Sequence, residues 1–169
     1  SYTDTAGNAG PAATTLNYVI ETTAPTVSSV STTADNQSSV AINANITVTF
    51  SEAMEPSYVT TGTSDAFCAG TIRVSSDNFS SCVKMSSSPA SSNSNMSFTL
   101  DPYDNLTVGT TYKTRVTTGV KDAAGNALSS QYETSCGFTT ISSSSSSSSS
   151  GIFVAVGNNG AIIRSTDNG

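Results

Sequence analysis

The sequence contains no histidine and no tryptophan, and only 11% of its 169 residues are charged. Histidine is the commonest general base near neutral pH, so its absence excludes every Ser-His and Cys-His nucleophile arrangement. The three cysteines lack the second cysteine pair or the histidine that would complete a four-ligand zinc site. We therefore expect that the protein is not an enzyme and that it has no catalytic residue.

Positive charge and long apolar runs are also scarce. Six Lys and Arg residues oppose twelve Asp and Glu residues, which gives a net charge of −6. Without a basic patch the chain is not expected to bind nucleic acid. No apolar run approaches the length of a membrane span, so membrane insertion is not expected. The chain starts at Ser1 without Met or a signal peptide, which predicts a processed form or a fragment.

Hydroxyl side chains are abundant instead, because serine and threonine together make up about a third of the chain. From Tyr112 to Val120 apolar and polar residues alternate, which is typical of a strand with one buried face. Leu106 and a glycine turn precede Tyr112, as in the tyrosine corner of Ig-like sandwiches. We expect Tyr112 to be buried, with its hydroxyl bonded to backbone near Leu106 or Thr107. Asp122 and Asn126 suit a tight connection to a last strand.

Short strands with turn signals between them fill the rest of the middle of the chain. They are predicted at 27–30, 45–50, 72–74, 79–85, 96–100 and 132–140. Residues 51–58 are predicted as a turn or a single helical turn, and residues 86–95 as a polar loop. Phe79, Val83 and Met85 are expected to face the core. Seven or eight such strands predict an all-β, Ig-like antiparallel β-sandwich over residues 26–140, with an extra terminal strand and hairpin.

Five sequence blocks in this region resemble a known family. They are Ala24-Pro-Thr-Val, Ile46-Thr-Val-Thr-Phe-Ser-Glu-Ala-Met54, Leu106 to Tyr112, Val120-Lys-Asp-Ala-Ala-Gly-Asn-Ala-Leu128 and Gly137-Phe-Thr-Thr140. Residues 24–140 thereby resemble the bacterial Ig-like domain named for an S-layer protein. The resemblance implies a spacer module of a secreted or surface-anchored bacterial protein, without catalytic residues. It also implies an extracellular or cell-surface location.

The cysteines are expected to play different roles. Cys68 and Cys82 bracket the two middle strands, and in an exported protein such a pair predicts a disulfide. Cys82 is out of phase with the apolar residues of its strand, so the bridge should lie on the outer side or at an edge. Cys136 is in phase with Tyr132 and Phe138, which predicts a buried, inert thiol. The alternative, a reactive cysteine, lacks an activating group nearby.

The two ends of the chain carry separate signals. Tyr2-Thr-Asp-Thr-Ala-Gly-Asn-Ala9 echoes Lys121-Asp-Ala-Ala-Gly-Asn-Ala-Leu128, with Ala6-Gly-Asn-Ala matching Ala124-Gly-Asn-Ala, and strand-like runs follow at 15–20 and 132–140. This repeat predicts that residues 1–25 are the last strand of a preceding Ig-like unit plus a joint at 21–25; chance similarity of a short turn is the alternative. Residues 141–150 are a serine linker by composition. Residues 151–169 predict a hairpin, and Ser165-Thr-Asp-Asn-Gly169 resembles the Asp-box of a β-propeller blade.

The sequence predicts no cofactor, and calcium is the ion for which it offers candidate ligands. Glu52 with Glu55, and Asp101 with Asp104, read better as solvated turns than as calcium ligands, because neither pair has the ligand density of a calcium loop. Asp4, Asn8 and Glu21 are slightly better calcium candidates if they converge at the joint.

Two functions remain open from the sequence. The first is a non-catalytic structural module of a bacterial surface or secreted protein: a stalk, S-layer element, adhesin spacer or fibre subunit. Its partners would be copies of itself or neighbouring domains, with a terminal strand of one subunit donated to the sheet of the next. The alternative is an accessory Ig-like domain of a secreted enzyme whose propeller binds or cleaves glycans.

Overall fold

The computed structural model describes residues 3–10, 19–64, 67–142, 154–156 and 162–164. Its strands are β1 (Val27–Ser31), β2 (Ile46–Phe50), β3 (Ile72–Ser75), β4 (Ala90–Ser92), β5 (Ser97–Leu100), β6 (Thr111–Val116), β7 (Tyr132–Glu133), β8 (Phe138–Thr139), β9 (Val154–Val156) and β10 (Ile162–Arg164). A 3₁₀ turn, η1, covers Pro56–Tyr58, and the described residues contain no α-helix. The predicted all-β class is confirmed.

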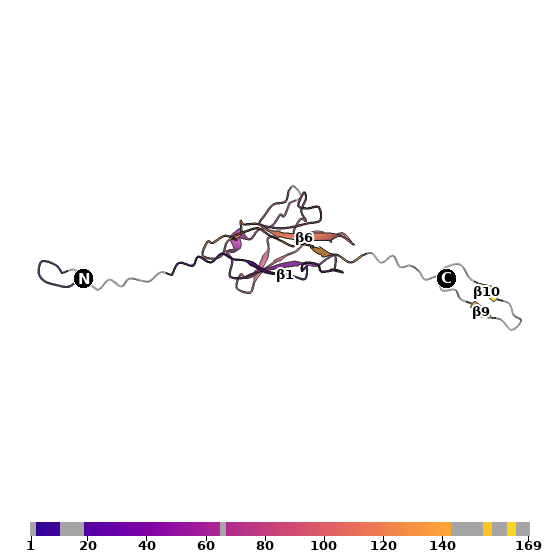
Figure 1. Cartoon of the computed structure of the whole chain (residues 1–169), viewed down its shortest axis with the longest axis horizontal. Helices are drawn as coiled ribbons and strands as arrows, with labels where there is room; N and C mark the ends of the chain where they lie inside the picture. The colour runs from indigo at the N-terminus through magenta and orange to yellow at the C-terminus, as the bar shows by residue number, and fades with distance from the viewer. Residues whose placement is uncertain (1–2, 11–18, 65–66, 143–153, 157–161, 165–169) are drawn as a thin grey trace.

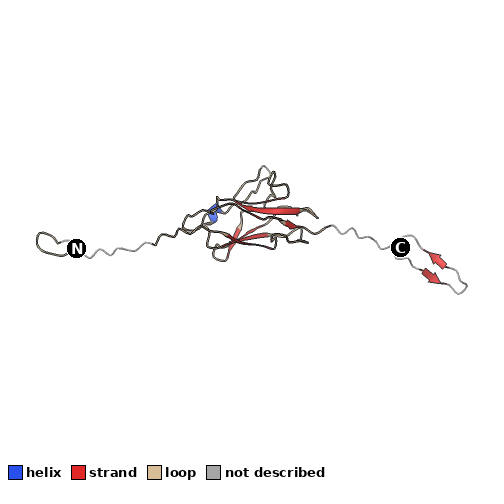
Figure 2. Cartoon of the chain, in the orientation of Figure 1, coloured by secondary structure: helices blue, strands red, loops and turns tan. Residues whose placement is uncertain are grey.

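Two antiparallel four-stranded sheets form the sandwich. The first sheet has the order β1-β2-β5-β4, and in the second β6 pairs with β3, β7 and β8. Figure 1 shows β1 and β6 in opposite layers, and Figure 2 shows the strands of both sheets with loops between them. The strand alternation places apolar side chains between the layers, because successive residues of a strand point to opposite faces. β9 and β10 pair with each other in a separate two-stranded sheet.

Aromatic pairs hold the centre of the core. Phe50 of β2 meets Phe98 of β5 edge to face, with ring centroids 5.9 Å apart. In the second sheet Tyr112 stacks on Phe138 at 5.6 Å. Such pairs add about 0.5–1.5 kcal/mol to the stabilisation from burial alone. Eighteen apolar side chains form one continuous buried cluster from both sheets.

Two of the expected strands and one expected loop differ from the structure. Residues 79–85 form a turn and an irregular segment, and Phe79 takes a left-handed φ of 64° instead of pointing into the core. Val83 packs only partly against the core, whereas Met85 is fully buried. The turn arises because Ser75 Oγ accepts from the backbone N–H groups of Asp77 and Phe79, which ends β3. The predicted loop at 86–95 contains β4, whose side chains are exposed and therefore give no apolar signal.

The last strand is also interrupted, so that β7 and β8 are separate and Cys136 lies on the surface as a free, exposed thiol. The expectation that Cys136 is buried is therefore wrong. Gly137 has a φ of 76°, and a side chain there would come within 2.2 Å of the carbonyl oxygen of Tyr112. Asp35 Oδ1 accepts from the backbone N–H groups of Cys136 and Gly137 at 2.8 and 2.6 Å, and Oδ2 from that of Ser135 at 3.1 Å. The Asp35 side chain, 101 residues from Cys136 in sequence, thus interrupts the alternation of buried and exposed residues that the sequence predicts for this strand.

Candidate functional site

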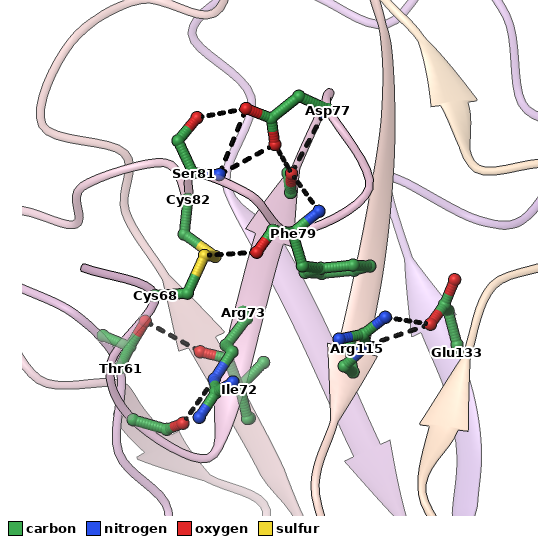
Figure 3. Close-up of a disulfide and its surroundings, with 12 residues drawn as sticks. Thr61, Cys68, Ile72, Arg73, Asp77, Phe79, Ser81, Cys82, Arg115 and Glu133 are labelled. Carbon is green, nitrogen blue, oxygen red and sulfur yellow. Dashed lines mark hydrogen bonds and ion pairs between the residues drawn. A yellow bond between two sulfur atoms is a disulfide. The ribbon is translucent and has the colours of Figure 1, made fainter.

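The Cys68–Cys82 disulfide closes the loop that precedes β3 onto the segment that follows it. Both cysteines are half-buried at the margin of the second sheet, outside the continuous core. The Cys68 sulfur lies 3.3 Å from the carbonyl oxygen of Phe79, and because a disulfide has no S–H proton this is a contact and not a donated hydrogen bond (Figure 3). The bridge is a structural tie between the two segments that flank β3.

Charged side chains lie beside this bridge on the second sheet (Figure 3). The Arg115 guanidinium packs on the Phe79 ring, 3.7 Å from its centroid, and donates to Glu133 Oε2 at 2.9 Å through Nε. Lys113 Nζ lies 3.6 Å from the other carboxylate oxygen of Glu133. This arrangement fixes β7 on β6 and gives the turn residue Phe79 a partner outside the core.

The Asp77 carboxylate caps the turn that follows β3. It accepts hydrogen bonds from the hydroxyl and backbone N–H of Ser81 and from the Ser75 hydroxyl. These bonds stabilise the ionised form, with those from Ser81 largest, and they lower the pKa of Asp77 to about 2. The group is a structural cap, since every partner is a neighbour within the same turn.

Tyr112 lies at the start of β6 with its ring in the core and 6% of its surface exposed. Its hydroxyl oxygen accepts from the backbone N–H of Thr107 at 3.0 Å. Leu106 is buried beside it, and its own N–H donates to the carbonyl of Ile42. This geometry matches that of a tyrosine corner, in which the phenol ties the loop before its strand to the sandwich.

Asp122 and Asn126 form a closed turn at the end where the chain enters the sandwich. Asp122 is 2% exposed, and Oδ1 accepts from the backbone N–H groups of Ala124 and Asn126. Burial acts to raise the pKa of Asp122, but the bonds from the Asn126 side chain and from the turn backbone outweigh it and hold that pKa below its usual value. The turn is docked by the Ala123 N–H, which donates to the Ala53 carbonyl at 3.0 Å.

Three carboxylate groups lie close together here, one from the turn itself and two from other segments. Oxygens of Glu21, Glu52 and Asp122 lie within 4.8 Å of one another. Burial, followed by the charges of Asp122 and Glu21, raises the pKa of Glu52. Oxygen ligands of this kind could hold a hard cation such as calcium.

The calcium candidates from the sequence are distributed differently. Asp4 and Asn8 bond to each other within one turn, through Asn8 Nδ2 and Asp4 Oδ2 at 3.0 Å. Glu21 contacts Asn126 and stands near Glu52 and Asp122, which sequence reasoning did not group with it. The sequence pairs Glu52 only with Glu55, its near neighbour along the chain. The tertiary contact across the joint has no local pattern that could have revealed it.

Two surface hollows of the described part of the chain carry no catalytic arrangement among the residues that line them. One is lined by hydroxyl and amide side chains and a lysine, at Ser75, Ser76, Asn78, Thr111 and Lys113. Another lies between β1 and the segment before β7 and is lined by Thr26, Val27, Leu128, Ser129, Ser130, Gln131 and Tyr132. Neither set pairs a nucleophile with a general base. Among the described residues, no helix has the length and apolarity that crossing a bilayer requires.

The fold and this sequence can be compared with known proteins. The family described as bacterial Ig-like domain matches residues 21–140. The chain belongs to this family. Among solved structures, it is similar to the S-layer protein rSbsC(31-844) at 22% identity and a TM-score of 0.47, over 70% of this chain and 14% of that one. It is also similar to the N-terminal part of the bacterial S-layer protein SbsC at 18% identity and a TM-score of 0.47, over 85% of this chain and 33% of that one.

The chain spans a third or less of the length of the S-layer structures that it matches. No curated protein matches it. Residues 15–18, most of the serine tract and the Asp-box-like residues 165–169 lie outside the described residues, so their assignments remain predictions.

Proposed function

We propose that this chain is a non-catalytic structural module of a bacterial cell-surface or secreted protein, and that it transmits position and load along a larger assembly. The observation that carries the proposal is that the chain enters and leaves the sandwich at opposite ends (Figure 1). At the entry Thr26 exchanges hydrogen bonds with Ser51, and at the exit Ile141 bonds to Val40 and Gly109. A domain anchored at both ends suits serial connection between neighbours.

Membership of the bacterial Ig-like family, the disulfide and the hydroxyl-rich surface support an extracellular position. The experiment is surface labelling of intact cells that express the native protein, with an antibody against residues 26–140. Labelling of intact cells, or recovery in the culture medium, is the expected result. Retention of the protein inside unbroken cells, with labelling only after lysis, would contradict the proposal.

Partners of the module are neighbouring Ig-like domains or further copies of the chain. Edge strands β1 and β4 of the first sheet offer backbone groups to an added strand, and residues 15–20 have the sequence pattern of a donor strand. Electron microscopy of the native material tests this donation. Fibres that disappear when residues 1–20 are deleted are expected. A protein that is monomeric both with and without residues 1–20 argues instead for a serial module without donation.

The second function is an accessory role in a secreted glycan-binding or glycan-cleaving enzyme. The antiparallel pairing of β9 with β10 favours it, because a propeller blade is built from such hairpins. A glycan array probed with the native protein separates the two functions: specific binding that is lost when residues 151–169 are deleted supports the accessory role.

A further inference from the structure

Two turns in the chain have the same hydrogen bonds although they are 118 residues apart. In the first, Asp4 Oδ1 accepts from the N–H groups of Ala6 and Asn8, and Asn8 Nδ2 donates to Asp4 Oδ2. In the second, Asp122 Oδ1 accepts from Ala124 and Asn126, and Asn126 Nδ2 donates to Asp122 Oδ2. Antiparallel bridges flank both turns, Thr3 with Ala9 and Lys121 with Ala127. The likeness extends from sequence to atomic geometry, which weighs against chance similarity.

The second turn makes a further contact through Asn126 that is not found for the first turn among the described residues. Asn126 Nδ2 also donates to the joint, to the Glu21 carbonyl at 3.3 Å and to Glu21 Oε2. Glu21 Oε1 in turn accepts from the N–H of Thr23. We call the hydrogen bonds between Asn126 and Glu21 the joint contact. It ties a linker residue to a turn that is itself docked on the sandwich through Ala53.

Alignment of the first turn with the second shows which residues of β8 correspond to the residues of the joint. With Asp4 aligned to Asp122, Ile20 falls at the position of Phe138 and Glu21 at that of Thr139. Phe138 is fully buried in β8, whereas Ile20 is 79% exposed. The same register places Val19 at Gly137, so the backbone of the two last strands must differ at that point, but an isoleucine at the position of a core aromatic ring is suited to the core of a preceding unit. Glu21 would then directly follow the core residue of that unit's last strand.

We propose that the joint contact is an interdomain brace: Asn126 of one Ig-like unit binds Glu21 at the end of the last strand of the preceding unit and holds the two units at a fixed angle. The partner is therefore a second Ig-like unit, joined in series. The proposal rests on the structural-module function and specifies how its units meet. The hydrogen bond to Glu21 Oε2 is charge-assisted, a class about twice as strong as neutral bonds, whereas the bond to the Glu21 carbonyl is neutral.

The full chain allows a direct test, with backbone relaxation of the amides of Thr22, Thr23, Ala24 and Thr26 as the readout. In the wild type these amides should have order parameters near those of β1, above about 0.8, and Asn126→Ala and Glu21→Ala should each lower them below about 0.6. Asn8→Ala is the matched control, because Asn8 makes the same bonds within its turn and, among the described residues, its side chain bonds only to Asp4. An unchanged spectrum for residues 27–140 verifies the fold of each variant.

Two outcomes of the relaxation experiment would contradict the proposed brace. One is a linker that keeps its order in both Asn126→Ala and Glu21→Ala. The other is loosening in Asn126→Ala alone, since this would trace to damage in the turn rather than to loss of the bond.

A chain with residues 21–138 duplicated in tandem tests the angle itself. In this chain residues 1–138 are followed by residues 21–169, so that Phe138 directly precedes the second Glu21. The free, exposed Cys136 of each unit accepts a spin label. A single narrow distance distribution is expected, and Asn126→Ala in the second unit should broaden it at least twofold.

The same substitution in the first unit is the control, because that Asn126 faces the first Glu21 and not the joint between units. Equal broadening by both substitutions, or a broad distribution in the unsubstituted tandem, would refute the brace. Surface labelling of cells is independent of these outcomes. Failure of the brace and failure of the structural-module function are therefore distinguishable.

Discussion

The two sheets of the sandwich achieve their stability by different chemistry. Strands β1, β2, β4 and β5 contain no charged residue, and hydroxyl pairs join β2 to β5 on the face away from the core: Thr47 with Thr99 at 2.9 Å and Thr49 with Ser97 at 3.0 Å. The second sheet carries Arg73, Lys113, Arg115 and Glu133 and has the disulfide beside it. The first sheet therefore depends on packing and backbone pairing, whereas the second adds covalent and ionic ties around an interrupted strand.

Removal of a core ring from the first sheet should have the largest effect. Phe98 is 1% exposed and packs against Phe50, so Phe98→Ala should lower the free energy of unfolding by about 3–5 kcal/mol. Urea unfolding followed by circular dichroism measures it. Phe67→Ala is the control, because that ring is 84% exposed and its removal should change little. A loss below about 1 kcal/mol in Phe98→Ala would mean that packing does not dominate the first sheet.

Loss of the disulfide should come next. The bridge closes a loop between residues 14 apart in sequence, for which the chain-entropy model gives about 3 kcal/mol. The Cys68→Ser, Cys82→Ser double variant should lose about that much and should still fold. Hydrogen exchange should accelerate around β3 more than in β2 or β5. Cys136→Ser is the control with no expected loss, and uniform acceleration in both sheets would contradict the division between them.

Loss of the Tyr112 hydroxyl should cost less, because the ring stays packed. Tyr112→Phe leaves the Thr107 N–H without its acceptor and should lower the free energy of unfolding by about 1 kcal/mol. Tyr103→Phe, at an exposed tyrosine, should be neutral. Thermal unfolding of both variants checks the pair, and equal effects would indicate that the Tyr112 hydroxyl adds nothing to the fold.

The smallest expected effect is on the stability of the fold at acid pH. The pKa of Asp77 is lowered from 3.8 to about 2 in the folded state, so its contribution to stability is present above pH 3.8 and is lost as the pH falls toward 2. Asp77→Asn should flatten the fall in stability over this range by a small amount, because the carboxylate is exposed to solvent. Urea unfolding at several pH values measures the slope. A variant whose acid profile equals the wild type would show that the hydrogen bonds of Asp77 are already present in the unfolded chain.

Period-two patterns located the strands whose alternation is regular. The strands predicted at 45–50 and 96–100 agree with β2 and β5, because each alternates side chains between core and solvent, and the strand predicted at 112–120 agrees with β6 up to its end at Val116. β4 was missed, since an edge strand of small exposed residues carries no apolar signal. Phe79 was misplaced because its hydrophobicity is satisfied by the Arg115 guanidinium and not by the core. Apolar character specifies that a residue needs a partner, not which partner it finds.

The sequence by itself determined the fold class, the cysteine pair suited to a disulfide and the repeated turn, because each depends on spacing along the chain. Only the tertiary structure decided the exposure of Cys136 and the joint contact of Asn126 with Glu21. Asp35 captures three backbone N–H groups from the far side of the chain, and Glu21 meets Asn126 across 105 residues. Hydrogen bonds between residues so far apart are fixed by the packing of the two sheets, which no local period encodes.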